Sequence, residues 1–253
     1  MGEITLKDKL NNFPFVVYIT LEEFIERGEF MESQLNKYEI PHKKYLTKRL
    51  SEMTDVIVHN SNIPQLGTGI CISHLNAMRW WYENSTDEYV IVCEDDHSFE
   101  SIDYWEFTWD EFMSRLPFDW ECVQLIRIIS PAEDYSTVDI LQNLSILSGR
   151  WWGGASLMRR SYVKKLLDRH VVDDKTYNLF VQSAYLQSLL ENILYVDAGI
   201  VYNFPMLVEK ISLDSTSRPP NITDEEYAQG KMHHIMSRNM IIDCWEKSGK
   251  LKI

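Results

Sequence analysis

Short apolar runs alternate along the chain with longer segments in which apolar residues recur every three or four positions. Such runs are typical of buried strands, and the periodic segments are typical of helices packed against a sheet. We expect strands within residues 13–21, 55–60, 89–96, 120–129, 145–160 and 194–205, and helices within residues 22–38, 69–84, 104–116, 161–170 and 176–193. This alternation predicts an α/β fold with a mostly parallel central sheet and helices on both of its faces.

The segment 69–84 has the clearest helical pattern. Its apolar stripe consists of residues three or four positions apart, namely Cys71, Leu75, Met78 and Tyr82. In the helix within 22–38, the candidates for inward-facing side chains are Phe24, Ile25, Phe30 and Leu35. Neither repeats nor low-complexity linkers interrupt the pattern, so we expect a single domain over residues 1–253, with residues 212–253 as a C-terminal tail that packs on the body.

Composition and charge narrow the classes of partner. Of the 253 residues, 45% are hydrophobic and 25% are charged, which is ordinary for a globular protein. The formal net charge of −13 makes nucleic acid an improbable general partner. A negatively charged ligand would need a metal ion or a few basic residues as a local bridge.

Cysteine usage and the amino-terminal segment bear on the compartment. The cysteines lie far apart and match no zinc-binding spacing, so we expect reduced thiols at Cys71, Cys93, Cys122 and Cys244. The first residues are charged and lack the apolar core of a secretory signal, and no apolar run is long enough to span a bilayer. We therefore expect a cytoplasmic protein without a membrane span.

The apolar run that ends at Cys93 is followed directly by the three acids Glu94, Asp95 and Asp96. In open α/β sheets, ligands bind beyond the carboxyl ends of the strands, where these acids should lie. A hard cation such as Mg²⁺ or Mn²⁺ would offset their mutual repulsion. In an extended strand end Glu94 and Asp96 project to the same side, and Asp95 points away. A solvated acidic turn after an edge strand is the alternative.

Two adjacent glycines, Gly153 and Gly154, interrupt the pattern within 145–160. They would permit a sugar to approach the backbone closely, and a β-bulge or turn is the equally weighted alternative. Tryptophan rings stack well on the C–H surface of sugars, so Trp152 is a candidate for the lining of a substrate cleft.

Several segments, taken in order, resemble glycosyltransferase family 25, which includes lipopolysaccharide sugar transferases and procollagen galactosyltransferases. The matching stretches within residues 14–218 are "VVYITLEEFIERGEFMESQL" with Tyr18, Thr20, Leu21 and Arg27, "GTGICISHLNAM" with Gly69, Cys71, Ser73 and His74, "VIVCEDD", "LPFDWECVQL", "GGASLMRRSYVKKLL", "VVDD" and "VYNFPMLVEKISLDSTS". The sequence departs from the family at Thr20, where Asn is usual, and at Lys210, near a position often occupied by Gln.

The resemblance implies a GT-A type fold, a nucleotide-sugar donor, inversion at the sugar carbon and a divalent cation, Mn²⁺ or Mg²⁺. It implies that Glu94 and Asp96 hold this cation together with a late histidine. We assign that histidine to His234, with His233 as the alternative. Surface histidines on an amphipathic tail helix are an equally weighted interpretation of both.

The resemblance also implies a catalytic base and a donor site. A carboxylate is the natural base for an inverting displacement, so Asp173 is the candidate and Asp174 the substitute. Capping of a following helix is the alternative for this pair. Tyr18 has core packing as its alternative, and His74 a purely structural role. The candidate donor-binding residues are Tyr18, Thr20, Ser73, His74, Asp95, Trp152, Gly153 and Gly154.

Taken together, these features predict a metal-dependent inverting glycosyltransferase. It would move a hexose, galactose or glucose, from a UDP-sugar to a hydroxyl of a glycan or of a collagen-like protein acceptor. The alternatives are a metal-dependent phosphoesterase, which usually distributes more ligands over several strand ends for two cations, and a non-catalytic sugar-binding protein of the same fold. Association into a homodimer stays open.

Overall fold

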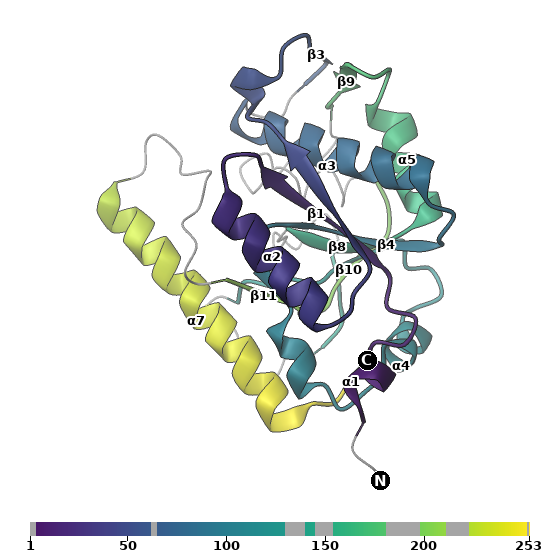
Figure 1. Ribbon diagram of the computed structural model, residues 1–253, viewed down its shortest axis with the longest axis vertical. Helices are drawn as coiled ribbons and strands as arrows, with labels where there is room; N and C mark the ends of the chain where they lie inside the picture. Colours follow the sequence, from purple (N-terminus) through teal and green to yellow (C-terminus); the bar gives the residue numbers. More distant parts are fainter. Residues whose placement is uncertain are drawn as a thin grey trace.

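A seven-stranded mixed sheet forms the centre of the fold (Figure 1). The computed structural model describes residues 4–61, 65–129, 140–144, 154–180, 198–210, 223–251 and 253. The strands of the sheet are, in spatial order, β2 (His42–Thr47), β1 (Phe15–Leu21), β4 (Tyr89–Glu94), β8 (Ala155–Arg159), β6 (Cys122–Gln124), β10 (Val201–Asn203) and β7 (Gln142–Asn143).

Most strands of the sheet run in one direction. β2, β1 and β4 pair in parallel, as do β6 and β10. β8 is antiparallel to both β4 and β6, and β7 is antiparallel to β10. The predicted α/β class with a mostly parallel sheet is confirmed. Two small sheets lie beside it, one pairing β3 (Ile57–His59) with β9 (Thr176–Asn178) and the other pairing β5 (His97–Ser98) with β11 (Val208–Glu209).

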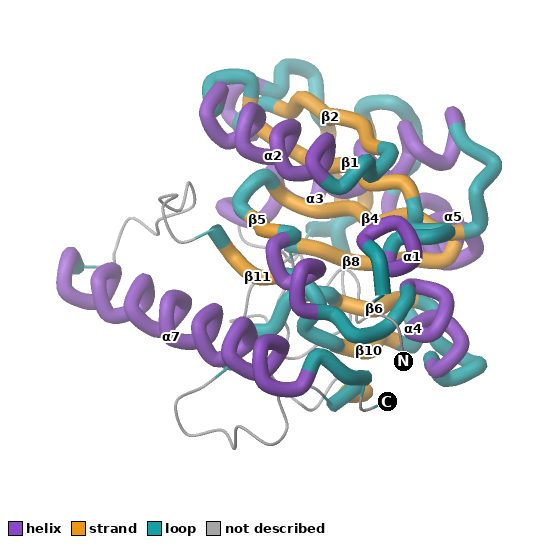
Figure 2. Tube along the Cα trace, turned by 60° about the horizontal axis from the view of Figure 1, so that its bottom comes forward, coloured by secondary structure: helices purple, strands orange, loops and turns teal. Residues whose placement is uncertain are grey.

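Helices cover both faces of the sheet, as the sequence predicts. The helical elements are α1 (Leu6–Lys9), α2 (Ile25–Lys37), η1 (Leu50–Glu52), α3 (Gln65–Asn84), η2 (Glu100–Tyr104), α4 (Trp109–Arg115), α5 (Arg160–His170) and α7 (Asp224–Ser248). α3 and α5 lie side by side on one face, and α2, α4 and α7 pack on the other (Figures 1 and 2).

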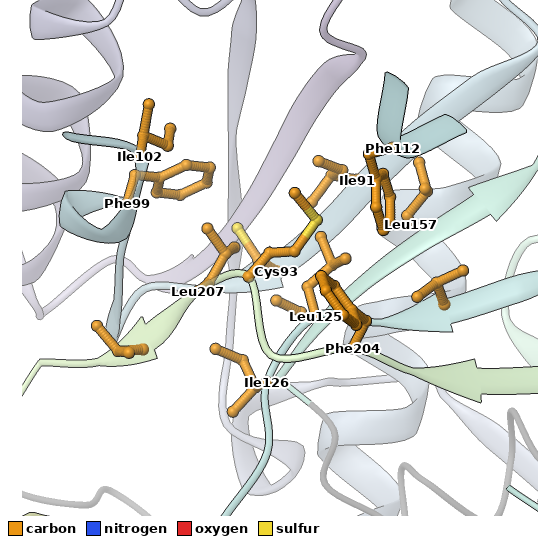
Figure 3. Close-up of a cluster of buried hydrophobic side chains, with 14 of the residues drawn as sticks. Ile91, Cys93, Phe99, Ile102, Phe112, Leu125, Ile126, Leu157, Phe204 and Leu207 are labelled. Carbon is orange, nitrogen blue, oxygen red and sulfur yellow. The ribbon is translucent and has the colours of Figure 1, made fainter. Parts of the chain in front are cut away.

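Successive residues of the central strands point to opposite faces and fill two cores. In β1, Val16 and Tyr18 face α2, whereas Val17 and Ile19 face α3. The β4 run follows the same rule, which explains why it is continuously apolar although it is a strand. Figure 3 shows part of the core on the α2 side, where side chains from β4 and β8 lie among the rings of α4 and the loop after β10.

The predicted helices 22–38 and 69–84 correspond to α2 and α3. Along α3 the predicted stripe is largely buried, with Cys71, Leu75 and Met78 inaccessible to solvent. In α2, Leu35 is buried as expected, but Ile25 is 64% exposed, and Met31 fills the core instead. The buried face of α2 is therefore rotated about the helix axis relative to the predicted one.

Three other predictions need correction. The helix expected over 104–116 begins only at Trp109, because Thr108 accepts a hydrogen bond from the backbone N–H of Glu111 and caps the helix there. The segment 176–193 begins with strand β9 rather than a helix, and residues 181–193 lie outside the described ranges. The edge strand β2 was missed, because its sequence "HKKYLT" is polar, as edge strands often are.

The described part of the tail is the long helix α7, which contacts β11 and η2. Thr223 caps its start, and Gly249, with φ of 60° in the left-handed region, ends it. Met240, Ile241 and Trp245 are buried in the core on the α2 side, and the indole N–H of Trp245 donates to a backbone carbonyl. In the ranges that the structure describes, no helix combines the length and apolarity needed to cross a bilayer.

Candidate functional site

A cavity of about 640 Å³ opens where β1, β2 and β4 end, between these strands and α3. This volume is in the range of pockets that enclose small molecules of drug or nucleotide size. The polar side chains that line it from these elements are Thr20, Thr47, Ser73, His74, Glu94 and Asp95. The parallel strands bring their carboxyl ends to the same edge, which is why residues distant in sequence meet here.

The acidic triplet is divided between the two faces of the sheet. Glu94 continues the alternation of β4 toward α3, where its Oε1 lies 3.2 Å from Nε2 of the buried His74. The strand ends at Glu94, and the chain turns at Asp95 and Asp96, which both contact Arg27 of α2. The expectation that Glu94 and Asp96 share one side while Asp95 points away is therefore wrong, because extended geometry stops at Glu94.

Arg27 compensates two of the three negative charges. Its Nη2 lies 2.7 Å from Oδ1 of Asp95 and 2.8 Å from Oδ2 of Asp96, and its side chain is only 7% exposed. Thr20 donates its hydroxyl to the other oxygen of Asp95. Burial nevertheless raises the pKa of Asp95 to about 6, against the opposing effects of Arg27 and Thr20. Arg27 and Thr20 engage both carboxylate oxygens of Asp95, so Asp95 stabilises the wall of the cavity.

Asp96 and His97 leave buried polar atoms without hydrogen bonds. Oδ1 of Asp96 lies 3.5 Å from Nδ1 of His97, and among the described residues neither that oxygen nor either ring nitrogen of His97 has a hydrogen-bond partner. Burial raises the pKa of Asp96 as well. Unsatisfied buried groups of this kind are costly and often mark a ligand or water site.

Gly154 supports the acids through its backbone. Its carbonyl accepts a hydrogen bond of 2.6 Å from the N–H of Glu94, and its φ is +97°. A Cβ at this position would lie 2.2 Å from Nε2 of His97. The sequence left open whether this glycine permits the approach of a sugar or forms a bulge or turn, and the structure shows that Gly154 is required for the close approach of His97. Trp152 and Gly153 lie outside the described residues.

The β5–β11 ribbon connects the acids to α7. Glu209 pairs with His97 across the ribbon, and its Oε2 lies 2.6 Å from Nδ1 of His234. The hydrogen bond with Glu209 raises the pKa of His234, and the charge of Asp96 adds to that shift. The neighbouring His233 instead contacts the backbone carbonyl of Ile129.

Glu94, Asp96 and His234 carry donor atoms of the types that suit a divalent cation. Carboxylate oxygens and imidazole nitrogens are ligands of Mn²⁺ and Mg²⁺ sites, and Oδ1 of Asp96 is a buried oxygen without a hydrogen bond. In the described part of the chain, no three His, Cys, Asp or Glu side chains converge on one point. Glu94, Asp96 and His234 thus have suitable donor types, but the described residues form no cation site.

Asp173 and Asp174 do not line the cavity. Oδ1 of Asp173 accepts hydrogen bonds from the N–H groups of Lys175 and Thr176, at 2.9 and 2.8 Å, and these bonds lower its pKa. The side chain of Asp174 is 96% exposed and contacts Arg79. Capping, the alternative interpretation, describes Asp173, although the capped turn leads into a strand. We therefore withdraw both residues as candidates for the base.

The other donor-site candidates fall into two groups. Thr20, Ser73 and His74 line the cavity, and the hydroxyl of Ser73 lies 2.7 Å from that of Thr47. Tyr18 is fully buried on the α2 side and donates its hydroxyl to Glu32. Tyr18 therefore packs in the core, as its alternative foresaw, and does not reach the cavity.

The sequence analysis missed the basic side of the cavity. Lys48 and Arg49 follow the unpredicted strand β2 and line the same cavity as the acids. Nε of Arg49 lies 2.8 Å from a carboxylate oxygen of Glu23, whereas Lys48 has no ion-pair partner among the described residues. The run "KKYLTKR" at 43–49 was the available signal, since an anionic ligand of an acidic protein needs such a bridge.

Comparison with known proteins yields only distant structural similarity. No family model matches the sequence, and no curated protein matches it. Among solved structures, A197 from STIV superposes with a TM-score of 0.40 at 10% identity, covering 77% of this chain and 83% of that protein. The inositol-1-phosphate CTP transferase from T. maritima gives 0.34 at 13% identity, with coverages of 87% and 76%.

A glycosyltransferase is also among the similar structures. The apo form of GlyE from Streptococcus pneumoniae TIGR4 superposes with a TM-score of 0.37 at 13% identity, covering 94% of this chain and 64% of that protein. Similarity this distant assigns no family and no activity. Membership of glycosyltransferase family 25 stays a prediction, and the function must be argued from the cavity itself.

Proposed function

We propose that the protein is a glycosyltransferase that binds a nucleotide-diphosphate sugar in the cavity at the ends of β1, β2 and β4. The observation that carries this proposal is that acidic and basic side chains line the same cavity. Glu94 and Asp95 supply the carboxylates, and Arg27, Lys48 and Arg49 supply the positive charges. A donor of this class combines a polyanionic diphosphate, which positively charged side chains bind, with a sugar and a base.

The reaction makes two electrostatic demands on the chain. The acceptor oxygen forms a bond to the anomeric carbon while the bond from that carbon to the diphosphate oxygen breaks, with inversion, and a general base takes the acceptor proton. Negative charge then grows on the leaving diphosphate. Lys48, which has no ion-pair partner among the described residues, is the group we assign to stabilise this charge.

A divalent cation, when bound, would neutralise the diphosphate as a Lewis acid and resolve its repulsion from Glu94 and Asp95. We assign Glu94, Asp96 and His234 to hold it. Arg27 already neutralises part of the charge of Asp95 and Asp96, so the cluster is stable enough to exist before the cation arrives. The proposed donor is a UDP-hexose, galactose or glucose, and the proposed acceptor is a hydroxyl of a glycan or protein.

A thermal-shift titration with UDP-glucose, UDP-galactose, GDP-mannose and a CMP-sugar, each with Mn²⁺ or with EDTA, tests the proposal. A ligand present at 100 times its Kd stabilises the native state by about 2.7 kcal/mol, which a melting curve resolves. We expect stabilisation that needs both a UDP-sugar and Mn²⁺, together with slow hydrolysis of the same donor. Stabilisation without hydrolysis or transfer would favour a sugar-binding protein.

A matched substitution controls for non-specific binding. Lys48→Gln should weaken UDP-sugar binding by about tenfold or more, as expected for the loss of one charge-assisted phosphate contact. Lys7→Gln, remote from the cavity, should leave the affinity unchanged. Turnover of simple phosphate esters in place of UDP-sugars would overturn the proposal in favour of a phosphoesterase.

A further inference from the structure

Arg49, a positively charged residue of the cavity lining, is paired with a carboxylate that lies outside the lining. Its Nε and Nη2 donate to Oε1 of Glu23, at 2.8 and 2.5 Å. Arg49 lines the cavity and Glu23 does not. Lys48, the residue before Arg49, has no ion-pair partner among the described residues. Part of the positive charge of the cavity is therefore engaged by the protein itself.

The parallel pairing of β1 and β2 brings the two partners together. Leu21 of β1 is the register partner of Thr47 of β2. Glu23 and Arg49 each follow two residues after these partners. Strands that run in the same direction leave the sheet at the same edge, so the residues after them stay neighbours. The ion pair thus joins the two loops that begin where the cavity opens.

Both loops are held by backbone hydrogen bonds of their own. The N–H of Phe24 donates to the carbonyl of Leu21 at 3.0 Å and closes the turn that carries Glu23. The carbonyl of Arg49 accepts from the N–H of Glu52 at 2.8 Å, at the start of η1. These supports do not involve the ion pair, so the pair can open without the loss of either one.

The ion pair is exposed and uses a single carboxylate oxygen. The side chains of Arg49 and Glu23 are 45% and 46% exposed, and exposed pairs contribute little because water solvates both charges. Both hydrogen bonds go to Oε1, whereas the strongest guanidinium contacts use two oxygens in parallel. A phosphate group offers two such oxygens and can therefore replace Glu23 as the partner of Arg49.

The ring of Phe24 supports the guanidinium of Arg49 from the cavity wall. Phe24 lines the cavity, and Cζ of Arg49 lies 5.8 Å from the centroid of its ring. This cation–π contact does not involve Glu23. A guanidinium that turns away from Glu23 can therefore stay beside the cavity, next to Lys48.

We propose that Arg49 binds the diphosphate of the donor and that Glu23 competes with this diphosphate for the guanidinium. Each binding event then exchanges an ion pair within the chain for a contact with the ligand, and each release restores the ion pair. Glu23 thereby lowers the affinity of the cavity for the arriving donor and for the leaving diphosphate. This inference rests on the proposed function, because it takes the ligand of the cavity to be a nucleotide diphosphate.

Titration calorimetry of the full chain with inorganic pyrophosphate, in EDTA and at low ionic strength, tests the competition. Low ionic strength preserves contacts between exposed charges, which salt would screen. Glu23→Gln should lower the Kd by about two- to fivefold, the factor expected when an exposed ion pair no longer has to open. Arg49→Gln should raise the Kd by about tenfold, as expected for the loss of a charge-assisted contact.

Two controls separate competition from simple repulsion between negative charges. Glu22→Gln removes a charge from the adjacent exposed position, which forms no ion pair among the described residues, and its Kd should stay close to the wild-type value. In the Arg49→Gln background, Glu23→Gln should no longer tighten binding. A double-mutant cycle requires this of two residues that act through one contact.

Nitrogen-15 NMR of the arginine side chains gives an independent readout. The Nε–H resonance of Arg49 should move when pyrophosphate is added to the wild type. In Glu23→Gln it should already differ from the wild type before the addition, because the hydrogen bond to the carboxylate is lost. A resonance that pyrophosphate leaves in place in the wild type would overturn the inference.

The sign of the change in Kd distinguishes competition from a merely structural ion pair. Loss of a structural pair would loosen the cavity wall, so a raised Kd in Glu23→Gln would overturn the inference, as would an unchanged one. Equal tightening in Glu22→Gln and Glu23→Gln would overturn it in favour of general repulsion.

The outcomes also separate this inference from the function on which it rests. A wild type that binds no pyrophosphate would overturn the role of Arg49 and Glu23, and the titration with UDP-sugars and Mn²⁺ would still decide whether the cavity binds a nucleotide donor. Competition for pyrophosphate in a protein that binds no UDP-sugar would support the exchange of partners at Arg49 and overturn the glycosyltransferase.

Discussion

Two acidic clusters of this chain look alike in sequence and differ in structure. Asp95 and Asp96 follow a buried central strand and share one buried arginine, whereas Asp173 and Asp174 lie in an exposed turn before an edge strand. In the first cluster burial raises the pKa of Asp95, and in the second backbone hydrogen bonds lower that of Asp173. Proximity of carboxylates is thus a poor guide to function, and their burial and counter-charge are a better one.

The largest expected difference between the clusters is in catalysis. Asp96→Asn should lower donor turnover by about 100-fold or more, since it removes a proposed ligand of the cation that would stabilise the leaving group. Asp173→Asn should change turnover by less than about twofold, because the side chain only caps a turn. The release of UDP from a UDP-sugar measures both. Equal losses in the two variants would restore Asp173 as a candidate for the base.

Replacing the arginine that pairs with each acidic cluster should show how much each ion pair contributes to the stability of the fold. Arg27→Met leaves the buried Asp95 and the partly buried Asp96 without a counter-charge and should lower the free energy of unfolding by about 3–5 kcal/mol. Arg79→Met removes the partner of the exposed Asp174, so its loss should be much smaller. Urea unfolding gives both values. A small loss for Arg27→Met would mean that water screens the cluster in solution.

The glycine behind the acids provides the next contrast. Gly154→Ala combines a positive φ with a Cβ placed 2.2 Å from His97, and it should cost about 3 kcal/mol or more. Gly230→Ala lies in α7, where a Cβ would meet no atom within 4 Å, and should stabilise the protein by about 0.5–1 kcal/mol. Thermal unfolding distinguishes the expected destabilisation by Gly154→Ala from the expected stabilisation by Gly230→Ala. An unchanged melting temperature for Gly154→Ala would show that His97 can move aside.

The smallest effect concerns pH, and its sign differs between the clusters. In metal-free protein the folded pKa of Asp95, about 6, exceeds the model-peptide value of 3.8, so the fold binds this proton more tightly than the unfolded chain does. Its contribution to stability therefore falls as pH rises from about 4 to 6, by no more than about 3 kcal/mol. Asp173 behaves oppositely, since its stabilisation is present above pH 3.8 and is lost as pH falls through its lowered pKa.

Carboxyl carbon-13 NMR assigns each of these titrations to its residue. Asp95 should titrate near pH 6 in EDTA-treated protein, and Asp173 should titrate below 3.8. Titration of Asp95 near 4 would indicate that the acidic turn is solvated, which is the alternative that its sequence left open.

The central part of the fold was predictable because each strand and helix has its own local signal. β1 and β4 are apolar on both faces, and α3 has a clear stripe, so their positions followed from periodicity alone. β2 was not predictable, since an edge strand that exposes lysines has no apolar pattern. The basic residues of the cavity were missed together with β2, because Lys48 directly follows that strand.

The site was predictable in its residue types and not in its contacts. The position of the acids after a buried strand predicted that they lie at the edge of the sheet, and Glu94 and Asp95 line the cavity there. The orientation of each side chain depends on the residue at which the strand ends. The pairing of Glu209 with His234 joins a two-residue strand to a distant helix, and no local pattern reports such a contact. Long-range contacts of this kind set the chemistry of the site, and they require the folded structure.

The position of Arg27 in the chain has a consequence for biosynthesis. A chain made from its amino terminus contains the acids and α2 well before α7, so Arg27 can compensate Asp95 and Asp96 while the ribosome still adds the segment that carries His234. The nascent protein can therefore bury its acids without waiting for an ion. Capture of the proposed cation would then be a late event that coincides with docking of the final helix.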